Sequence, residues 1–177
     1  MKGFQYQAEL IAPAEEESLL DEIGKLALKE APYRQFTAKR RIVMFEPVPD
    51  FLAPLRDKVA AWAGIPSAHI AHALVTEYRP GTQLGWHRDS PEYGELAGVS
   101  LGGHCRMRLR PYPPQKGDRK SVLSMELAPR SAYSMREEAR WGWQHSIAPT
   151  ATLRYSITFR TLRERMLHPR ENGYYRQ

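Results

Sequence analysis

From His72 to Arg160, short apolar runs alternate with turns that contain Gly or Pro, and this pattern limits the folds open to the chain. The runs are HALVTEY, GVSLGG, CRMRLRP, SVLSMEL, SAYSMRE and LRYSITFR. Short strands with such regular punctuation are typical of an antiparallel barrel or sandwich. The sequence therefore predicts a β core in this part of the chain, with PPQKGDRK (113–120) as a hairpin loop.

Helical periodicity is confined to the residues ahead of these strands. Across residues 14–30, apolar side chains recur at helical spacing, and acidic residues gather at the N-terminal end, where they favour the helix dipole. Residues 51–63 repeat the helical spacing, and Gly64 ends the pattern. Between the two helices, RIVMFE (41–46) is typical of a strand. We therefore expect one α+β domain over residues 1–177, with helices packed outside a strand core.

The chain carries 26 Lys and Arg residues against 20 Asp and Glu residues, a formal net charge of +6. Such a balance favours polyanions such as nucleic acids, although many proteins without such partners are equally basic. The basic residues gather in YRQFTAKRR (33–41), RMRLRPYPPQKGDRK (106–120) and RTLRERMLHPRENGYYRQ (160–177). Each segment fits either a solvated face or a contact with phosphates.

The location of the protein is inferred from what the sequence lacks. A single cysteine, Cys105, excludes an internal disulfide, and residues 1–10 lack the apolar run of a signal peptide. No stretch approaches the ~18 apolar residues that a membrane-spanning helix needs. We therefore expect a cytoplasmic protein without a membrane partner.

His87 and Asp89 stand two positions apart in GWHRD, and alternation along an extended segment would point both side chains to the same side. His145, in WGWQHSI, can supply a third metal ligand. Two histidines and one carboxylate on one face of an octahedron leave positions open, the arrangement of non-haem Fe(II) oxygenases. A strand histidine beside a turn aspartate is also common without a metal, so the pair alone leaves both interpretations open.

A second constellation lies in RYSITFR (154–160), where the odd-numbered residues are apolar and the even-numbered ones are polar or cationic. Arg154 and Arg160 would lie on one face, with Ser156 and Thr158 between them, about 20 Å apart along the extended backbone. Guanidinium groups pair with carboxylates and keep their charge when partly buried. The pattern therefore fits a site for a dicarboxylate. It fits equally well two solvated arginines on an edge strand.

Together these stretches resemble the AlkB family of Fe(II)- and 2-oxoglutarate-dependent dioxygenases. The resemblance runs from about residue 40 to residue 160 and is carried by TEYRPGTQLGWHRD (76–89), LAPRSAYSMREEARWGWQHSI (127–147) and RYSITFR. It implies a double-stranded β-helix, or jelly roll, with the N-terminal helices packed outside. It also implies that His87, Asp89 and His145 are the catalytic ligands of Fe(II).

The resemblance further implies a cosubstrate site. Arg154, with the Tyr78 hydroxyl, would hold the distal carboxylate of 2-oxoglutarate, and Arg160 would lie toward the end that chelates iron. Thr76 and Ser156 stand where prototypical members carry Asn, and both keep the capacity to hydrogen-bond near the cosubstrate.

In such enzymes, dioxygen and 2-oxoglutarate yield succinate and carbon dioxide while a substrate carbon is hydroxylated, and an N-alkyl group is released as an aldehyde. The resemblance therefore implies oxidative dealkylation of N-alkylated bases, in repair of alkylated DNA or in RNA, by a protein that we expect to be a monomer. The same chemistry on a protein, lipid or small molecule is an alternative. A basic nucleic-acid-binding module with a vestigial iron site is a third hypothesis.

The family builds its substrate lid from the segment ahead of the jelly roll. Residues 1–70 would thus hold the helices and the lid, and residues 71–162 the jelly-roll core. Tyr33 and Phe36 could stack on a flipped base, and Arg40 and Arg41 could hold phosphates. The segment fits a helix end and a basic strand edge equally well. A lid of this modest size would suit single-stranded DNA or RNA.

Other positions carry smaller expectations. After the ligand aspartate, Pro91 and Glu92 replace an acidic pair that reads the base in prototypical members, so only Glu92 matches. The stretch GVSLGG (98–103) is expected to serve close backbone packing, and Glu137 replaces a turn glycine of many members. The three tryptophans near the predicted ligands fit either core aromatics or a dry wall around the oxidant; they are Trp86, Trp141 and Trp143.

Overall fold

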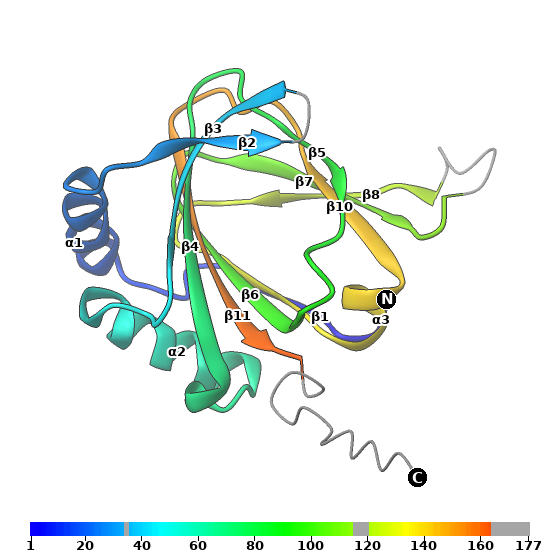
Figure 1. The fold of residues 1–177 in the computed structure, drawn as a ribbon, viewed down its shortest axis with the longest axis horizontal. Helices are drawn as coiled ribbons and strands as arrows, with labels where there is room; N and C mark the ends of the chain where they lie inside the picture. The colour runs from blue at the N-terminus through cyan, green and yellow to red at the C-terminus, as the bar shows by residue number, and fades with distance from the viewer. Residues whose placement is uncertain (34–35, 115–120, 164–177) are drawn as a thin grey trace, which may run out of the picture.

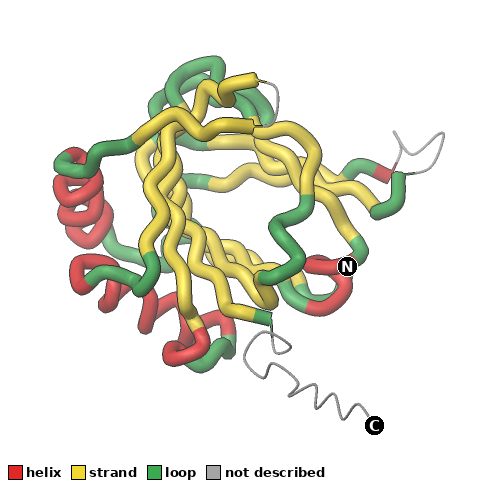
Figure 2. Tube along the Cα trace, in the orientation of Figure 1, coloured by secondary structure: helices red, strands yellow, loops and turns green. Residues whose placement is uncertain are grey.

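The strands of the protein form two antiparallel sheets that face each other, with two helices on the outside of the larger sheet (Figures 1 and 2). The computed structural model describes residues 1–33, 36–114 and 121–163, and at residues 32, 33 and 36–39 it describes the backbone alone. Within these residues, no helix is long and apolar enough to cross a membrane. The predicted hairpin loop lies largely outside the described residues.

The larger sheet has the order β1-β9-β6-β11-β4-β3-β2 and the smaller one β5-β10-β7-β8. The strands of the larger sheet are β1 (Phe4–Gln7), β2 (Lys29–Tyr33), β3 (Phe36–Phe45), β4 (Ile70–Tyr78), β6 (Tyr93–Gly102), β9 (Ala132–Met135) and β11 (Arg154–Leu162). Those of the smaller sheet are β5 (Leu84–His87), β7 (Cys105–Pro111), β8 (Leu123–Leu127) and β10 (Trp143–Ile147). The helices are α1 (Pro13–Gly24), α2 (Ala53–Ala63), the short α3 (Glu137–Trp141), and the 3-10 turns η1 (Asp50–Leu52) and η2 (Ser67–His69).

The outer core lies between α1, α2 and the larger sheet. Leu19 and Ile23 of α1 and Val59 of α2 belong to the same buried cluster as Ile157 and Phe159 of β11. These strand residues are the odd-numbered ones, so the apolar face predicted for RYSITFR is the face that the helices cover. Burial of this kind stabilises a fold by about 25 cal/mol per Å² of apolar surface. The expectation of an α+β jelly roll with helices packed outside is confirmed.

The even-numbered face of β11 points instead into the space between the sheets. There the residues of the larger sheet meet the second buried cluster, which includes Met107 and Leu109 of β7 and Ile147 of β10. In the same space, the even-numbered residues 154–160 of β11 line a largely polar pocket. Period-2 alternation in a single strand thus separates a helix-covered core from a polar pocket.

The N-terminal elements differ from the expectation in three ways. The first helix ends at Gly24 instead of reaching residue 30, because residues 29–33 leave it to pair with β3, with Lys29 opposite Ile42. The strand expected at residues 41–46 begins at Phe36. The short strand β1, which pairs with β9, was not expected. The elements β2 and β3 therefore form an antiparallel strand pair at the edge of the larger sheet.

Candidate metal and cosubstrate site

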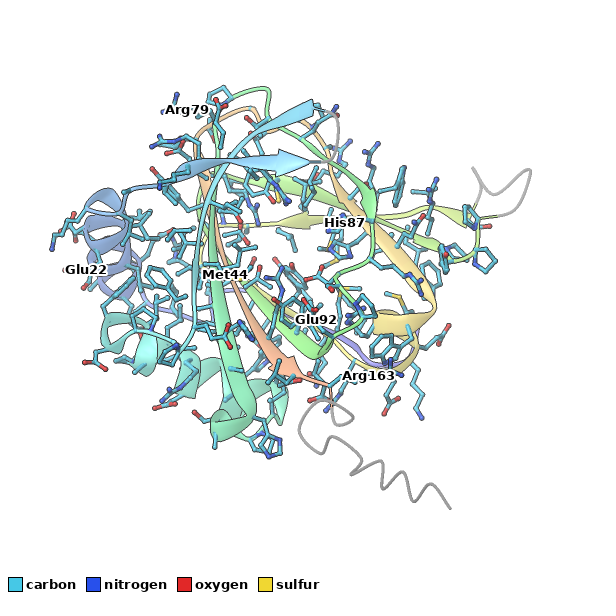
Figure 3. All side chains as sticks on the ribbon, in the orientation of Figure 1. Glu22, Met44, Arg79, His87, Glu92 and Arg163 are labelled. Carbon is cyan, nitrogen blue, oxygen red and sulfur yellow. The ribbon has the colours of Figure 1, made fainter. Side chains whose placement is uncertain are left out.

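His87, Asp89 and His145 come together on the inner side of the smaller sheet. His87 ends β5, His145 lies directly opposite it on β10, and Asp89 follows β5 by two residues. One ligand atom from each residue lies within 4.8 Å of the others. Asp89 Oδ1 is 3.7 Å from His87 Nε2 and 3.6 Å from His145 Nε2. Figure 3 shows His87 on the strand that borders the space between the sheets.

Both imidazoles are held in the neutral form that can bind a metal. Burial lowers the pKa of His145 to about 3, and the adjacent His87 contributes to the lowering. Burial also lowers the pKa of His87. His87 Nδ1 lies 2.9 Å from the carbonyl of Gly85, a contact that requires Nδ1 to carry the proton. Nε2 of His87 therefore keeps its lone pair, on the side where Asp89 lies.

Asp89 is held as a carboxylate. Burial alone would raise the pKa of Asp89, but Arg160 and the two histidines together hold it well below its ordinary value. Arg160 Nε donates to Asp89 Oδ2 at 2.7 Å. The other oxygen is the one that faces the histidines. The donor set of two neutral imidazoles and one carboxylate oxygen fits a divalent metal such as Fe(II).

Arg154 provides an anion site deeper in the same pocket. Its side chain is buried, its Nε donates to Ser100 Oγ at 2.9 Å, and its guanidinium lies 5.0 Å from the Tyr78 ring centroid. Nη1 is also buried and finds no hydrogen-bond partner among the described residues. A buried cationic donor without a partner is costly, and a carboxylate would satisfy it. The residues present therefore fit a carboxylate-bearing cosubstrate.

The pocket contains every residue predicted for metal and cosubstrate. Thr76 and Ser156 lie opposite each other in the pairing of β4 with β11, and both line the pocket beside Tyr78 and Arg154. The full wall consists of Arg40, Leu74, Thr76, Tyr78, Leu84, His87, Asp89, Leu96, Tyr133, His145, Ile147, Arg154, Ser156, Thr158 and Arg160. Arg160 takes its place in this wall through its contact with Asp89.

The two arginines predicted for substrate binding point to opposite faces of β3. Arg40 lines the pocket, and its Nε is buried without a partner among the described residues. Arg41 is not part of the pocket wall: its guanidinium reaches Glu77 at 3.1 Å and the Leu28 carbonyl at 3.0 Å. Successive strand residues point to opposite faces, so only one of the pair can enter the pocket. Arg41 instead ties β3 to β4 and to the chain after α1, and its role in substrate binding stays a prediction.

The remaining residues predicted for substrate binding are Tyr33, Phe36 and Glu92. The side chains of Tyr33 and Phe36 lie outside the described part of the structure. Glu92 lies on the connection between β5 and β6 (Figure 3), where it is exposed and absent from the pocket wall, and its carbonyl accepts the Arg163 N–H at 2.8 Å. A role for Glu92 in reading a base stays a prediction.

Tyr133 is a pocket residue that the sequence reasoning missed. It extends from β9 into the wall, is 7% exposed, and burial raises the pKa of its hydroxyl. A Cβ at Gly98 would lie 2.5 Å from its ring, so the glycine is what lets the ring cross β6. The close packing expected for GVSLGG is thus found at Gly98. The absent side chain was the signal, but its partner is not visible in the sequence.

For the tryptophans, the expectation of core aromatics is met only in part: Trp143 packs, half-buried, against the second buried cluster. None of the three lines the pocket. Trp141 is 36% exposed and lies between the guanidinium groups of Arg140 and Arg163, at 4.3 and 4.7 Å from them. Trp143 donates to Glu138 Oε1 at 3.2 Å, and Trp86 lies on the outer face of the smaller sheet. Each of the three indoles thus meets a charged group, and none of them contributes to the wall of the pocket.

A sequence profile of the 2OG-Fe(II) oxygenase superfamily matches residues 5–160. The chain belongs to this superfamily, whose members use Fe(II), 2-oxoglutarate and dioxygen, so the enzyme class and the cofactors expected from the sequence are confirmed. Within it, the resemblance to AlkB-like proteins is confirmed by relatives of that type. The chain and the Danio rerio protein called Probable RNA/DNA demethylase ALKBH6 are 23% identical over 160 residues, which cover 80% of this chain and 68% of that protein.

The chain is also similar to a viral protein and to two solved structures. The Uncharacterized protein L905 of Acanthamoeba polyphaga mimivirus is 26% identical over 196 residues, which cover 95% of this chain and 89% of the relative. The structure of OsALKBH1 has a TM-score of 0.74 at 13% identity and covers 91% of this chain and 99% of its own. A Pseudomonas putida prolyl-4-hydroxylase has a TM-score of 0.64 at 16% identity and covers 91% of this chain and 93% of its own. These two structures share the fold.

Proposed function

We propose that the protein oxidatively removes alkyl groups from N-alkylated bases in DNA or RNA. The observation that carries the proposal is the pocket itself, where a His-Asp-His cluster and the unpartnered Nη1 of Arg154 face the same space. A metal ligand set alone would fit many enzymes. The added buried cation fits the dicarboxylate cosubstrate of this superfamily.

In this proposal, the residues of the pocket have two roles, metal binding and cosubstrate binding. His87, Asp89 and His145 would hold Fe(II), and Arg160 keeps the Asp89 carboxylate ionised and aimed at the histidines. Bound iron would supply the activation of dioxygen that oxidises 2-oxoglutarate and the alkyl carbon. Arg154 would bind the distal carboxylate of 2-oxoglutarate, while the hydroxyl-bearing residues around it orient the same group; these are Tyr78, Thr76 and Ser156.

Support for a nucleic-acid substrate comes from three sources. A curated relative is named as a probable RNA/DNA demethylase, and the net charge of +6 favours a polyanion. Arg40 adds a cation to the pocket wall, and burial together with the charge of Arg40 lowers the pKa of His87, which places that cation near the cluster. A phosphate next to the target base would satisfy the buried Nε of Arg40. We further propose a single-domain monomer that acts in the cytoplasm on single-stranded substrates.

The test is succinate and formaldehyde release by the anaerobically iron-loaded chain, given 2-oxoglutarate and oxygen. Single-stranded DNA that carries N-methylated bases is compared with the same unmethylated strand. We expect both products to rise with the methylated strand, and to vanish in Asp89→Ala. Succinate that is formed without stimulation by methylated DNA or RNA would contradict the proposal, and would move the search to proteins or small molecules. Nucleic-acid binding that survives without any turnover in the wild type would favour the vestigial module.

A further inference from the structure

The outer face of the smaller sheet carries a row of arginines. In β7, Arg106, Arg108 and Arg110 alternate with residues that point into the core. Residues two apart on a strand lie on the same face, about 6.7 Å from one another. Helices α1 and α2 lie on the far side of the molecule (Figure 1), so neither covers this face. The row is therefore a regularly spaced series of cations on an open sheet.

The neighbouring strands hold each arginine by its Nε. Arg108 donates to Ser146 Oγ at 3.0 Å, Arg110 to Gln144 Oε1 at 2.8 Å, and Arg106 to Glu126 Oε1 at 2.9 Å. In the described part of the chain, no carboxylate lies within ion-pair distance of Arg108 or Arg110. Fixing Nε orients the guanidinium plane while the terminal nitrogens stay available as donors. Two of the three cations are thus positioned without being neutralised.

Aromatic rings lie among these cations. The Trp86 ring on β5 has Arg110 Cζ at 4.4 Å and Arg108 Cζ at 5.3 Å from its centroid. At the rim, Arg88 Cζ lies 3.7 Å from the centroid of the exposed Tyr112 ring. Rings interleaved with cations are what a single nucleic-acid strand requires, since phosphates pair with the guanidinium groups and bases stack on the rings. An acidic peptide would use the charges but not the rings.

The same strands connect this face to the catalytic pocket. His87, the last residue of β5, lies between Trp86 and Arg88 in the sequence, and His145 lies between Gln144 and Ser146 on β10. The arginine row is therefore the back of the wall whose inner side carries the histidines. A single nucleic-acid strand bound to this face would therefore pass next to the catalytic pocket.

We infer that the outer face of the smaller sheet, centred on Trp86, Arg108 and Arg110, docks the backbone of single-stranded nucleic acid. The docked nucleotides flank the target, and the target base enters the pocket on the other side of the wall. This inference rests on the proposed function for its role in catalysis, but binding to the face is measurable without turnover.

The first test measures anisotropy of a short, fluorescein-labelled, unmethylated single-stranded DNA mixed with the full chain. The double variant Arg108→Gln/Arg110→Gln is compared with Arg56→Gln/Lys58→Gln, which removes the same charge from α2. We expect roughly tenfold weaker binding in the first variant and a change below about twofold in the second. Loss of two phosphate contacts should also reduce the steepness of the salt dependence, making the negative slope of log K against log salt smaller in magnitude by about 1.4.

The second test separates stacking from charge. Trp86→Leu should weaken binding by about fivefold or more, and Trp86→Phe should restore most of it, as expected for loss of one stacked base. Thermal unfolding of each variant checks that it folds. Equal losses in both double variants would overturn the inference, because net charge alone would then explain binding. Displacement of the DNA by polyglutamate at equal charge would also overturn it, in favour of an acidic protein.

Measuring turnover distinguishes a failure of this inference from a failure of the proposed function. On methylated single-stranded DNA, the Arg108→Gln/Arg110→Gln variant should show a raised KM with an unchanged kcat. If the wild type dealkylates DNA and the variant matches it in KM and affinity, the docking face is wrong and the function stands. If the wild type binds through this face but releases no formaldehyde from methylated DNA or RNA, the docking face stands and the function is wrong.

Discussion

Arg160 and Asp89 form a buried ion pair that fixes which carboxylate oxygen faces the two histidines. Arg160 Nε donates to Asp89 Oδ2 at 2.7 Å, and Asp89 Oδ1 lies 3.6 Å from His145 Nε2. The arginine was expected near the end of the cosubstrate that chelates iron. In the structure it touches a predicted metal ligand, so its first effect is on the metal site.

Replacing Arg160 should therefore weaken metal binding. In Arg160→Gln the Asp89 carboxylate loses its charged partner, so it becomes easier to protonate and free to rotate. Loss of such a supporting contact typically costs 10- to 100-fold in metal affinity. Anaerobic titration with Fe(II), or with Mn(II) as a stable probe, measures the effect, and Arg56→Gln on α2 serves as the control. Unchanged affinity would show that Asp89 is oriented by other contacts.

Arg154 should control the affinity for 2-oxoglutarate. Arg154→Lys keeps the charge but loses the planar pair of donors, one of which is the unpartnered Nη1. A charged hydrogen bond contributes about 1.5–3 kcal/mol, so the KM for 2-oxoglutarate should rise by about 10- to 100-fold. The KM for the methylated strand should change little. Tyr155→Phe is the matched control, because Tyr155 points to the other face and contacts Glu77. A rise in the KM for the methylated strand alone would contradict this assignment.

Gly98→Ala should destabilise the protein by forcing Tyr133 out of place. The added Cβ would lie 2.5 Å from one ring carbon of Tyr133 and 2.8 Å from its hydroxyl oxygen. Overpacking of this kind costs about 1–3 kcal/mol of unfolding free energy, which urea denaturation measures. Gly24→Ala meets no atom within 4 Å and should show no loss. If the ring is the cause, the double variant Gly98→Ala/Tyr133→Leu recovers part of the loss.

Glu137→Gly should stabilise the protein. Glu137 has a φ of 49°, in the left-handed region, which costs a residue with a side chain about 1–2 kcal/mol. Glycine removes this cost but loses about 0.5–1 kcal/mol of conformational entropy, which leaves a gain of up to about 1.5 kcal/mol. Glu138→Gly should instead destabilise, because Glu138 accepts hydrogen bonds from the Lys2 N–H and from Trp143. Chemical denaturation of the two variants side by side gives the comparison, and equal losses would refute the strain.

The sequence predicted the parts of the site that depend on local alternation. RYSITFR separates its two faces within one strand, and GWHRD places its histidine and aspartate without reference to any other element. Local alternation could not decide whether Arg40 or Arg41 faces the pocket. The strand β3 is longer than its apolar run, and its pairing with β4 sets which side chains point inward.

Contacts between strands that are far apart in the sequence could not be predicted from local patterns either. Tyr133 enters the pocket only because Gly98, on another strand, leaves room for its ring. The end of α1 depends on a competing partner, since residues 29–33 gain a ladder with β3 that a longer helix would forgo. In each case, the deciding atom lies far along the chain from the residue that it places.

The weak attachment of β5 has a consequence for the life of the protein in a cell. β5 is one of the two edge strands of its sheet and is in register with β10 only at His145–His87 and Ile147–Leu84, with an irregularity between them. Edge strands held so sparsely are the first to detach, and their departure bares a template for aggregation. A metal held by His87 and His145 would fasten this strand to its neighbour. We therefore expect iron supply to govern the abundance of the protein as well as its activity, because iron-starved chains would be degraded sooner.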